Sequence, residues 1–172
     1  MRLKLIFPTE EFEEEWKSII QEFEETQEKV KPFALKGPLD NYEKYLENAC
    51  RYLKGENIPE GRVPAGVFFL IYEGEKRILG SIDIRYGLND YLFTIGGNIG
   101  YSIRPSERKK GYATEMLRMG LDICREKCIK KVLITCNKSN IASAKVIIKN
   151  GGVFENEIPD GEEIVQRYWI EL

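Results

Sequence analysis

Hydrophobic positions along the chain follow first a helical and then a strand-like period. Residues 3–7 form a short apolar run, which predicts a first strand. After it, apolar residues recur every three or four positions in two stretches, which predicts two amphipathic helices. Their stripes are Phe12, Trp16, Ile19, Ile20 and Phe23, and then Tyr42, Tyr45, Leu46, Ala49, Cys50 and Leu53.

Capping residues indicate where these two helices begin and end. Thr9 is placed to cap the first helix, and acidic residues follow it in the positive first turn. Asp40 and Glu43 resemble a capping box at the start of the second helix. Gly55 predicts the end of that helix, because glycine readily takes the left-handed conformation common after a helix C-terminus.

From residue 67 onwards the pattern predicts mainly strands. An apolar run at 67–72, a turn at 73–76 and a strand at 77–86 indicate a hairpin, and 91–95 is either strand or irregular. Further strands are expected at 99–104, 132–136, 153–157 and 164–170, and helices at 111–127 and 141–149. The order β-α-α-β-β-β-α-β-α-β-β shows no repeat or linker. It predicts one α/β (α+β) domain over residues 1–172 with a mixed central sheet.

Composition narrows the chemistry that this fold can support. The 172 residues include 26 Lys and Arg against 28 Asp and Glu, a net charge of −2, and no histidine. The missing imidazole excludes Ser-His-Asp and Cys-His nucleophiles and histidine-built metal sites. The near-zero charge argues against a nucleic-acid partner. Any reaction must therefore use carboxylates, Tyr, Ser, Cys, Lys, backbone amides or water.

The chain carries no signal for a membrane or an oxidising compartment. It lacks the run of about 18 apolar residues that a membrane span needs, and its first residues do not form a signal peptide. We therefore expect a cytoplasmic protein with no membrane partner. Its four cysteines, Cys50, Cys124, Cys128 and Cys136, are expected to be free core or structural thiols rather than metal ligands, and no metal is expected.

A basic segment between a predicted strand and a predicted helix carries the clearest chemical signal. From Arg104 to Lys110 there are four positive charges and one negative charge, and Gly111 and Ala113 follow at the helix start. A helix N-terminus with small residues and nearby cations suits a phosphate or pyrophosphate. The alternative is a solvated basic loop that caps an ordinary helix. The spacing matches neither a Walker loop nor a GxGxxG fingerprint.

This segment resembles a known family motif. Arg108, Gly111 and Ala113 match the Arg/Gln-x-x-Gly-x-Gly/Ala motif of GNAT acetyltransferases, after a strand that ends in an aliphatic residue, any residue and Pro. The wider run 97–117 is similar to a bacterial subgroup of predicted GNAT enzymes, and the element order also fits. The resemblance implies the GNAT acyl-CoA N-acyltransferase fold, with acetyl-CoA as co-substrate and a primary amine as acceptor.

The resemblance also implies roles by position. The main chain of Ile103 would bind the pantetheine arm, between strands 99–103 and 132–136 that diverge. Asn140 and Ser143 fall in an Asn-x-x-Ala/Ser pattern near the acetyl end, although both also favour helix starts. The backbone expected to hold the pyrophosphate is that of Arg108, Lys109, Lys110, Gly111, Tyr112 and Ala113, with Thr114 beside it.

The proton-transfer groups of the family are only partly recognisable. Ile147 occupies the position where many members carry a tyrosine that protonates the leaving thiolate, and strands 97–103 and 132–136 contain no acid. The candidate catalytic residues are Tyr101, Asp83 and Ser143, with Asp90 and water as further options. Two functions therefore stay open: N-acetyl transfer in a ternary complex, or a catalytically weak acetyl-CoA or CoA sensor or interaction module.

The sequence leaves the acceptor and the oligomeric state open. The acidic faces of the first two helices would suit a cationic amine, but such faces are also typical of plain solvent exposure. The acceptor amine is therefore unidentified, and a homodimer is one of the states that the chain allows.

Overall fold

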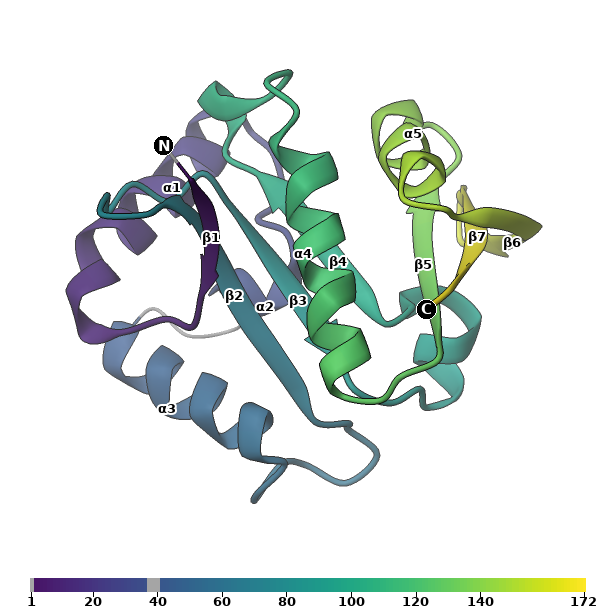
Figure 1. Ribbon diagram of the computed structural model, residues 1–172, viewed down its shortest axis with the longest axis horizontal. Coiled ribbons are helices and arrows are strands. Elements are labelled where there is room, and N and C mark those ends of the chain that lie inside the picture. The colour runs from purple at the N-terminus through teal and green to yellow at the C-terminus, as the bar shows by residue number, and fades with distance from the viewer. Residues whose placement is uncertain (1, 37–40) are drawn as a thin grey trace.

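The computed structural model describes residues 2–36 and 41–172 and contains a seven-stranded mixed sheet (Figure 1). The strand order is β1-β2-β3-β4-β5-β7-β6, and every pairing is antiparallel except that of β4 with β5. The strands are β1 (Leu3–Ile6), β2 (Ala65–Tyr72), β3 (Gly80–Arg85), β4 (Ile99–Ile103), β5 (Lys131–Asn137), β6 (Val153–Asp160) and β7 (Glu163–Glu171). The predicted α/β fold class with a mixed sheet is therefore confirmed.

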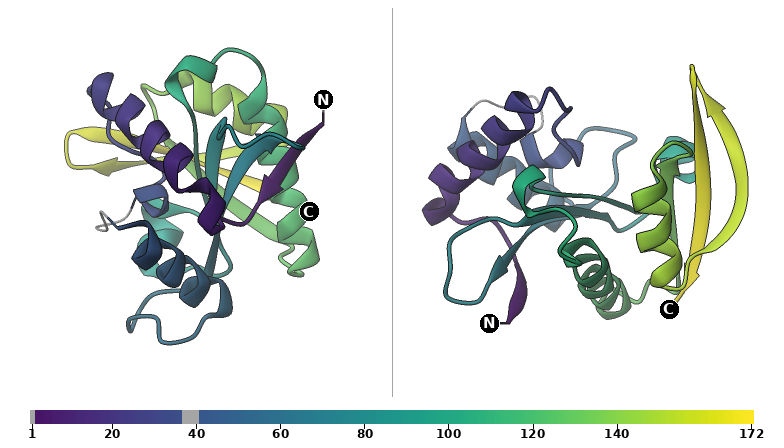
Figure 2. Two further views of the ribbon diagram at one scale, coloured as in Figure 1. Left: turned by 90° about the vertical axis from the view of Figure 1, so that its left-hand side faces the viewer. Right: turned by 90° about the horizontal axis from the view of Figure 1, so that it is seen from above.

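Helices cover both faces of this sheet, with α1 to α3 on one side and α4 and α5 on the other (Figure 2). The α-helices are α1 (Glu13–Glu25), α2 (Phe33–Lys36), α3 (Tyr42–Lys54), α4 (Tyr112–Glu126) and α5 (Ile141–Lys149). Three short helical turns are η1 (Glu10–Phe12), η2 (Leu92–Gly96) and η3 (Pro105–Glu107). The segment left open between strand and irregular structure, 91–95, is helical: Tyr91 immediately precedes the π-helical turn η2, and 92–95 belong to it.

Strand β2 explains why its sequence is almost continuously apolar. Val67, Phe69 and Ile71 belong to the core beneath α1 and α3, whereas Leu70 belongs to the core beneath α4 and α5. Side chains alternate between the two faces of a strand, so a strand covered on both faces buries nearly every residue. The two helical layers are thus built on the same central strands.

The predicted helix caps are only partly correct. Thr9 precedes η1, but its side chain makes no capping hydrogen bond. The Asn41 side chain caps α3 by accepting from the Lys44 N–H at 3.0 Å, whereas the predicted cap Asp40 lies outside the described residues. Gly55 ends α3 in the left-handed conformation with φ of 70°, as predicted.

All four cysteines are free, but only Cys124 and Cys136 are buried. Cys50 and Cys128 are exposed, so of the two expected alternatives, core or structural thiols, the core position is wrong for these two. Cys128 lies just beyond α4 with φ of 58°, which turns it away from the helix stripe. Among the described residues, no helix is long and apolar enough to cross a membrane, and no cluster of three or more Cys, Asp or Glu could hold a metal ion.

Candidate active site

Strands β4 and β5 meet at one end and then diverge. Ile99 opposite Ile134 is their single register pair among the described residues. Beside it, the Asn98 N–H donates to the Leu133 carbonyl at 2.6 Å, and the Asn98 side chain accepts from the Leu133 N–H at 2.8 Å. A Cβ on Gly97 would lie 2.8 Å from the Leu133 carbonyl oxygen, so the close approach requires glycine there. Beyond this junction the two strands separate towards α5 (Figure 1).

The diverging edge of β4 presents main-chain polar groups. The Arg85 N–H donates to the Asn98 carbonyl, and the Arg104 N–H donates to the Leu79 carbonyl, so the main chains of Gly100 and Ser102 between them face β3. In an antiparallel pair the alternate residues point their N–H and C=O groups the other way. The main chains of Tyr101 and Ile103 therefore face the gap towards β5. An open strand edge of this kind can bind an extended chain that contains amides.

The loop after β4 turns into α4 through two residues with positive φ. Lys109 has φ of 64° and Gly111 has φ of 85°, and α4 begins immediately afterwards at Tyr112. A Cβ on Gly111 would meet no atom within 4 Å, so the backbone angle rather than space favours glycine here. The first N–H groups of an α-helix have no partner inside the helix, and the dipole of this 15-residue helix favours an anion at them.

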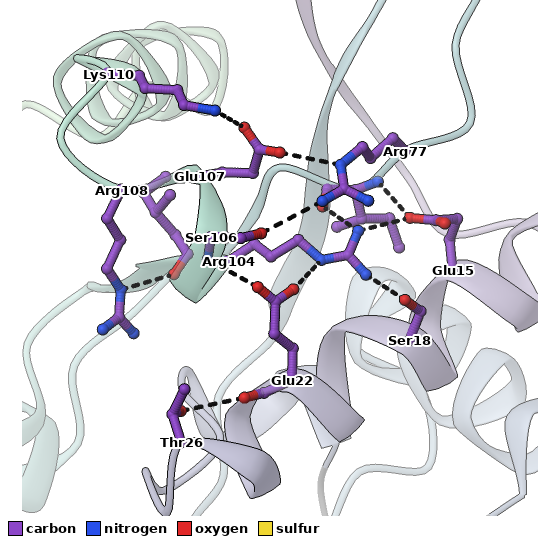
Figure 3. Close-up of polar contacts among 12 residues, drawn as sticks. Glu15, Ser18, Glu22, Thr26, Arg77, Arg104, Ser106, Glu107, Arg108 and Lys110 are labelled. Atoms are coloured by element: carbon purple, nitrogen blue, oxygen red, sulfur yellow. Dashed lines mark hydrogen bonds and ion pairs between the residues drawn. The ribbon is translucent and has the colours of Figure 1, made fainter.

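Arg104 does not belong to an open cationic loop. Its side chain is 1% exposed and lies between β4 and α1 (Figure 3). Its Nε lies 2.7 Å from a Glu22 oxygen, its Nη1 lies 2.9 Å from Glu15, and its Nη2 donates to Ser18. Burial raises the pKa of Glu22, but hydrogen bonds from Ser106 and the charge of Arg104 outweigh it, so the net shift is downward.

The other charged side chains of the loop are also largely paired. Both Nη atoms of Arg108 donate to Glu28 at 2.8 Å, and Lys110 lies 2.7 Å from Glu107 (Figure 3 shows the second pair). Glu107 thus serves as the ion-pair partner that its place in the loop suggests. Among the described residues Lys109 makes no ion pair. The phosphate-binding potential of this loop therefore lies mainly in its backbone and in Lys109.

Tyr112 also turns its side chain away from the helix start. Its hydroxyl lies 3.0 Å from that of Tyr72, and the two rings pack edge to face at 85°. The pKa of Tyr112 is raised to about 12. The hydrogen bond with Tyr72 is the main cause, and burial is the second. Only the main chain of Tyr112 thus remains available at the N-terminus of α4.

Tyr101 and Ser143 meet across the opening. Tyr101 comes from β4 and Ser143 from α5, and their hydroxyl oxygens lie 2.9 Å apart. Burial raises the pKa of Tyr101 to about 12, although the Ser143 hydrogen bond opposes the shift. Asn140 fixes the start of α5 by accepting from the Ser143 N–H at 3.1 Å. Two hydroxyl groups that were separate candidates in the sequence therefore form one hydrogen-bonded pair.

Ile147 cannot replace the family tyrosine in any way. Its side chain is fully buried in the core that α5 shares with α4 and β5. The position therefore contributes packing rather than a hydroxyl group. Tyr101 supplies a phenol from a different element, β4, and its hydroxyl contacts Ser143 of α5.

Asp83 lies on the opposite face of the sheet from the core of α4. It is 5% exposed, and its Oδ2 lies 2.9 Å from the Arg85 Nε. Burial raises the pKa of Asp83, and the charge and hydrogen bond of Arg85 oppose this only in part. The described contacts include no hydrogen bond from Asp83 to Tyr101 or Ser143. Asp90 is exposed and is not among the described residues that line the cleft.

One cleft of about 1490 Å³ connects these candidates. Asp83, Tyr101, Asn140 and Ser143 line it, together with residues 29–34, one side of α3 and the η2 turn. None of its described lining residues comes from α1. The sequence did not identify the lining contributed by residues 29–34, because neither a motif nor a periodicity marks a loop that folds over a distant strand.

Comparisons with known proteins identify the family and the fold of the chain. A model of the acetyltransferase (GNAT) domain matches residues 2–153. A search of curated proteins gives no match.

Several solved structures share the fold. A putative ribosomal-protein-serine acetyltransferase from Vibrio cholerae superposes with a TM-score of 0.69 at 19% identity, over 100% of this chain and 95% of that one. RimJ from Mycobacterium smegmatis, in complex with CoA-disulfide, superposes with a TM-score of 0.73 at 19% identity, over 98% of this chain and 81% of that one. The microcin C7 self-immunity acetyltransferase, in complex with acetyl-CoA and AMP, superposes with a TM-score of 0.68 at 18% identity, over 99% of this chain and 92% of that one.

Proposed function

The chain belongs to the GNAT acetyltransferase family, and from this premise we propose that it transfers the acetyl group of acetyl-CoA to a primary amine. The amine would attack directly while both substrates are bound. The observation that carries the proposal is the divergence of β4 and β5 after Ile99, with a helix N-terminus at one end of the gap and a hydroxyl pair at the other. We further propose that the protein acts in the cytoplasm as one domain, where its four free thiols would remain reduced.

The residues around the gap fit a CoA thioester. The backbone N–H groups of residues 108–113, with Thr114 beside them, would bind the pyrophosphate. The Ile103 N–H faces the gap and would bind a pantetheine amide, while its carbonyl also accepts from the Arg108 Nε at 3.3 Å. The amide nitrogen of Asn140 remains to donate, because its oxygen caps α5. Acetyl-CoA supplies an activated acetyl group, and a backbone N–H of β4 would polarise its carbonyl.

The Tyr101–Ser143 pair is suited to deliver a proton. With a pKa of about 12, Tyr101 keeps its proton at neutral pH and can pass it through Ser143 to a leaving thiolate. Asp83, whose pKa burial raises, is the candidate to accept the amine proton on the other side of β4. Positioned proton transfer typically contributes a factor of about 10² to 10⁴, so binding geometry would supply the remainder.

A second candidate function is favoured by Ile147. A buried isoleucine at the tyrosine position would suit a protein that binds acetyl-CoA or CoA as a sensor or interaction module and turns over slowly.

Two measurements separate the candidates. Calorimetric titration with acetyl-CoA and CoA tests cofactor binding, and an absence of binding heat at high micromolar protein would refute both functions. Release of free thiol with a panel of primary amines then tests transfer. Release above the rate without protein supports the transferase, whereas binding without release supports the sensor.

A further inference from the structure

The cleft collects positive charge although the chain as a whole is slightly negative. The net charge of the chain is −2. The acidic residues in the described lining are Asp83 and Asp160. The basic residues in the same lining are Lys29, Lys31, Lys36, Arg51, Arg62 and Arg85.

Most of these cations are not neutralised within the fold. Asp83 and Arg85 pair with each other, and Lys36 pairs with Glu24. Arg51 donates only to the neutral side chain of Asn48, at 2.7 Å. Lys29, Lys31 and Arg62 make no ion pair among the described residues, and the same holds for Asp160.

Among the described ion pairs, Glu24 is the one acidic residue of α1 that pairs with a lining cation, Lys36. Glu15 and Glu22 turn to the buried Arg104, and Glu28, which follows α1, turns to Arg108. The acidic faces of the two helices that suggested a cationic acceptor in the sequence contribute no acidic residue to the described lining of the cleft. What faces the cleft from residues 29–31 is instead a pair of lysines.

A tyrosine with an unpartnered hydroxyl group is also among the lining residues. Tyr45 is 3% exposed, and its hydroxyl has no hydrogen-bond partner among the described residues. Its ring is held by stacking on Tyr42 and Phe69, with centroids 5.5 and 6.4 Å away. Burial and the charges of nearby groups raise the pKa of Tyr45, so its hydroxyl stays a donor. A buried donor without a partner costs free energy, which a bound acceptor atom would recover.

We infer that the amine acceptor also carries an anionic group, a carboxylate or a phosphate, which the cleft cations Lys29, Lys31, Arg51 and Arg62 bind. The inference rests on the proposed function, because it assigns a substrate class to the same site. Opposite charges in a cleft with low-dielectric walls attract over several ångströms. A polyamine would place a second cation among these side chains and would be repelled.

Four amines of similar length test this in the CoA-loaded protein. They are 4-aminobutyrate, 3-aminopropylphosphonate, butylamine and putrescine, and calorimetry measures their binding. We expect the carboxylate or the phosphonate to bind at least about 10-fold more tightly than butylamine, as one charge-assisted contact would provide, and putrescine to bind least. The tighter of the two anionic probes identifies which anion the cleft prefers. Equal affinities, no binding by any probe, or a preference for putrescine would overturn the inference.

Charge-reversal variants locate the effect. Arg62→Glu and Lys130→Glu change the net charge equally, but Lys130 is exposed and is not among the described lining residues. Arg62→Glu should abolish most of the preference for the anionic probe, and Lys130→Glu should preserve it. An unchanged preference in Arg62→Glu, or an equal loss in both variants, would overturn the assignment to the cleft.

Tyr45→Phe provides an independent readout. We expect it to weaken the anionic probe several-fold while the melting temperature stays the same or rises, because the hydroxyl has no partner in the unliganded fold. Unchanged affinity would remove Tyr45 from the site. Thiol release measured in parallel separates the two proposals: anion-selective binding without acetyl transfer refutes the proposed function while showing that the cleft binds anions, and transfer without anion selectivity refutes the inference alone.

Discussion

Both guanidinium Nη atoms of Arg108 donate to the two carboxylate oxygens of Glu28, each at 2.8 Å. The pair joins the loop before α4 to the segment after α1, across 80 positions of sequence. Arg108 is the arginine of the family motif, yet its side chain is committed to the fold. Its contribution to cofactor binding is therefore expected to come mainly through its backbone.

The Arg108–Glu28 pair should contribute modestly to stability, and only above acidic pH. Arg108 holds the pKa of Glu28 below its usual value of 4.5. When folding lowers the pKa of a carboxylate, the resulting stability is fully present above the pKa of the unfolded state. It is lost as the pH falls through the pKa of the folded state. Because both side chains are about 40% exposed, Glu28→Gln should cost about 0.2 to 1 kcal/mol at pH 7. Urea unfolding at pH 7 and below pH 4 measures this, and a loss independent of pH would contradict it.

The buried Arg104 should matter far more than an exposed arginine of the same network. Arg104→Met leaves Glu15 and Glu22 without their buried partner, so we expect a loss of about 3 to 5 kcal/mol. Arg77→Met is the matched control, because Arg77 is 46% exposed and should cost less than about 1 kcal/mol. Chemical denaturation compares the two variants. Equal losses would show that Arg104 does not hold α1 against β4 as its contacts indicate.

Gly111 and Gly74 allow a test of the α4 N-terminus. Both have φ of 85°, and a Cβ on either would meet nothing within 4 Å. Substitution by alanine should therefore strain each turn by a similar amount, about 1 to 2 kcal/mol. Only Gly111→Ala should also weaken CoA binding in calorimetry, because only that turn aims helix N–H groups at the expected pyrophosphate. Equal CoA affinity in the two variants would argue against binding of the pyrophosphate at the N-terminus of α4.

Tyr101 and Ser143 should act as one unit in catalysis. Tyr101→Phe and Ser143→Ala are each expected to lower kcat by about 10² to 10⁴ with little change in CoA affinity. The double variant should lose little more than the worse single variant, since both changes break the same relay. With a Tyr101 pKa of about 12, the wild-type rate should not fall through loss of this proton below about pH 11. Multiplicative losses in the double variant would indicate independent roles.

Asp83 should govern the acidic side of the pH profile. Burial raises its pKa, so the carboxylate becomes protonated, and stops accepting a proton, at a higher pH than an exposed aspartate would. We expect kcat/KM to fall as pH decreases through this raised pKa. Asp83→Asn should lower kcat/KM and remove that limb of the profile. Circular dichroism and CoA affinity control for misfolding, and a retained acidic limb in this variant would exclude Asp83 as the base.

Much of the local architecture follows from residue periodicity and turn chemistry. The helix at 141–149 has the predicted bounds because Asn140 and Asn150–Gly151 mark its ends within the chain. The hairpin of β2 and β3 and the end of α3 at Gly55 follow for similar reasons. Thr9 and Asp40 were less informative about the helix caps. Several neighbouring polar residues can cap a helix, and local geometry selects among them.

By itself, the sequence determined the order of the strands and of the longer helices, although not the short helix α2, together with the glycine turn before α4 and the absence of a family tyrosine at Ile147. These features depend on residues close together in the chain. The tertiary structure alone decided that Arg104 is buried with Glu22, that Tyr101 meets Ser143, and that the cleft is basic. Each of these pairs joins side chains more than 40 positions apart, and their contacts depend on which faces the sheet and helices bring together. Charge in the sequence is only a count, whereas the fold determines which charges cancel and which face a ligand.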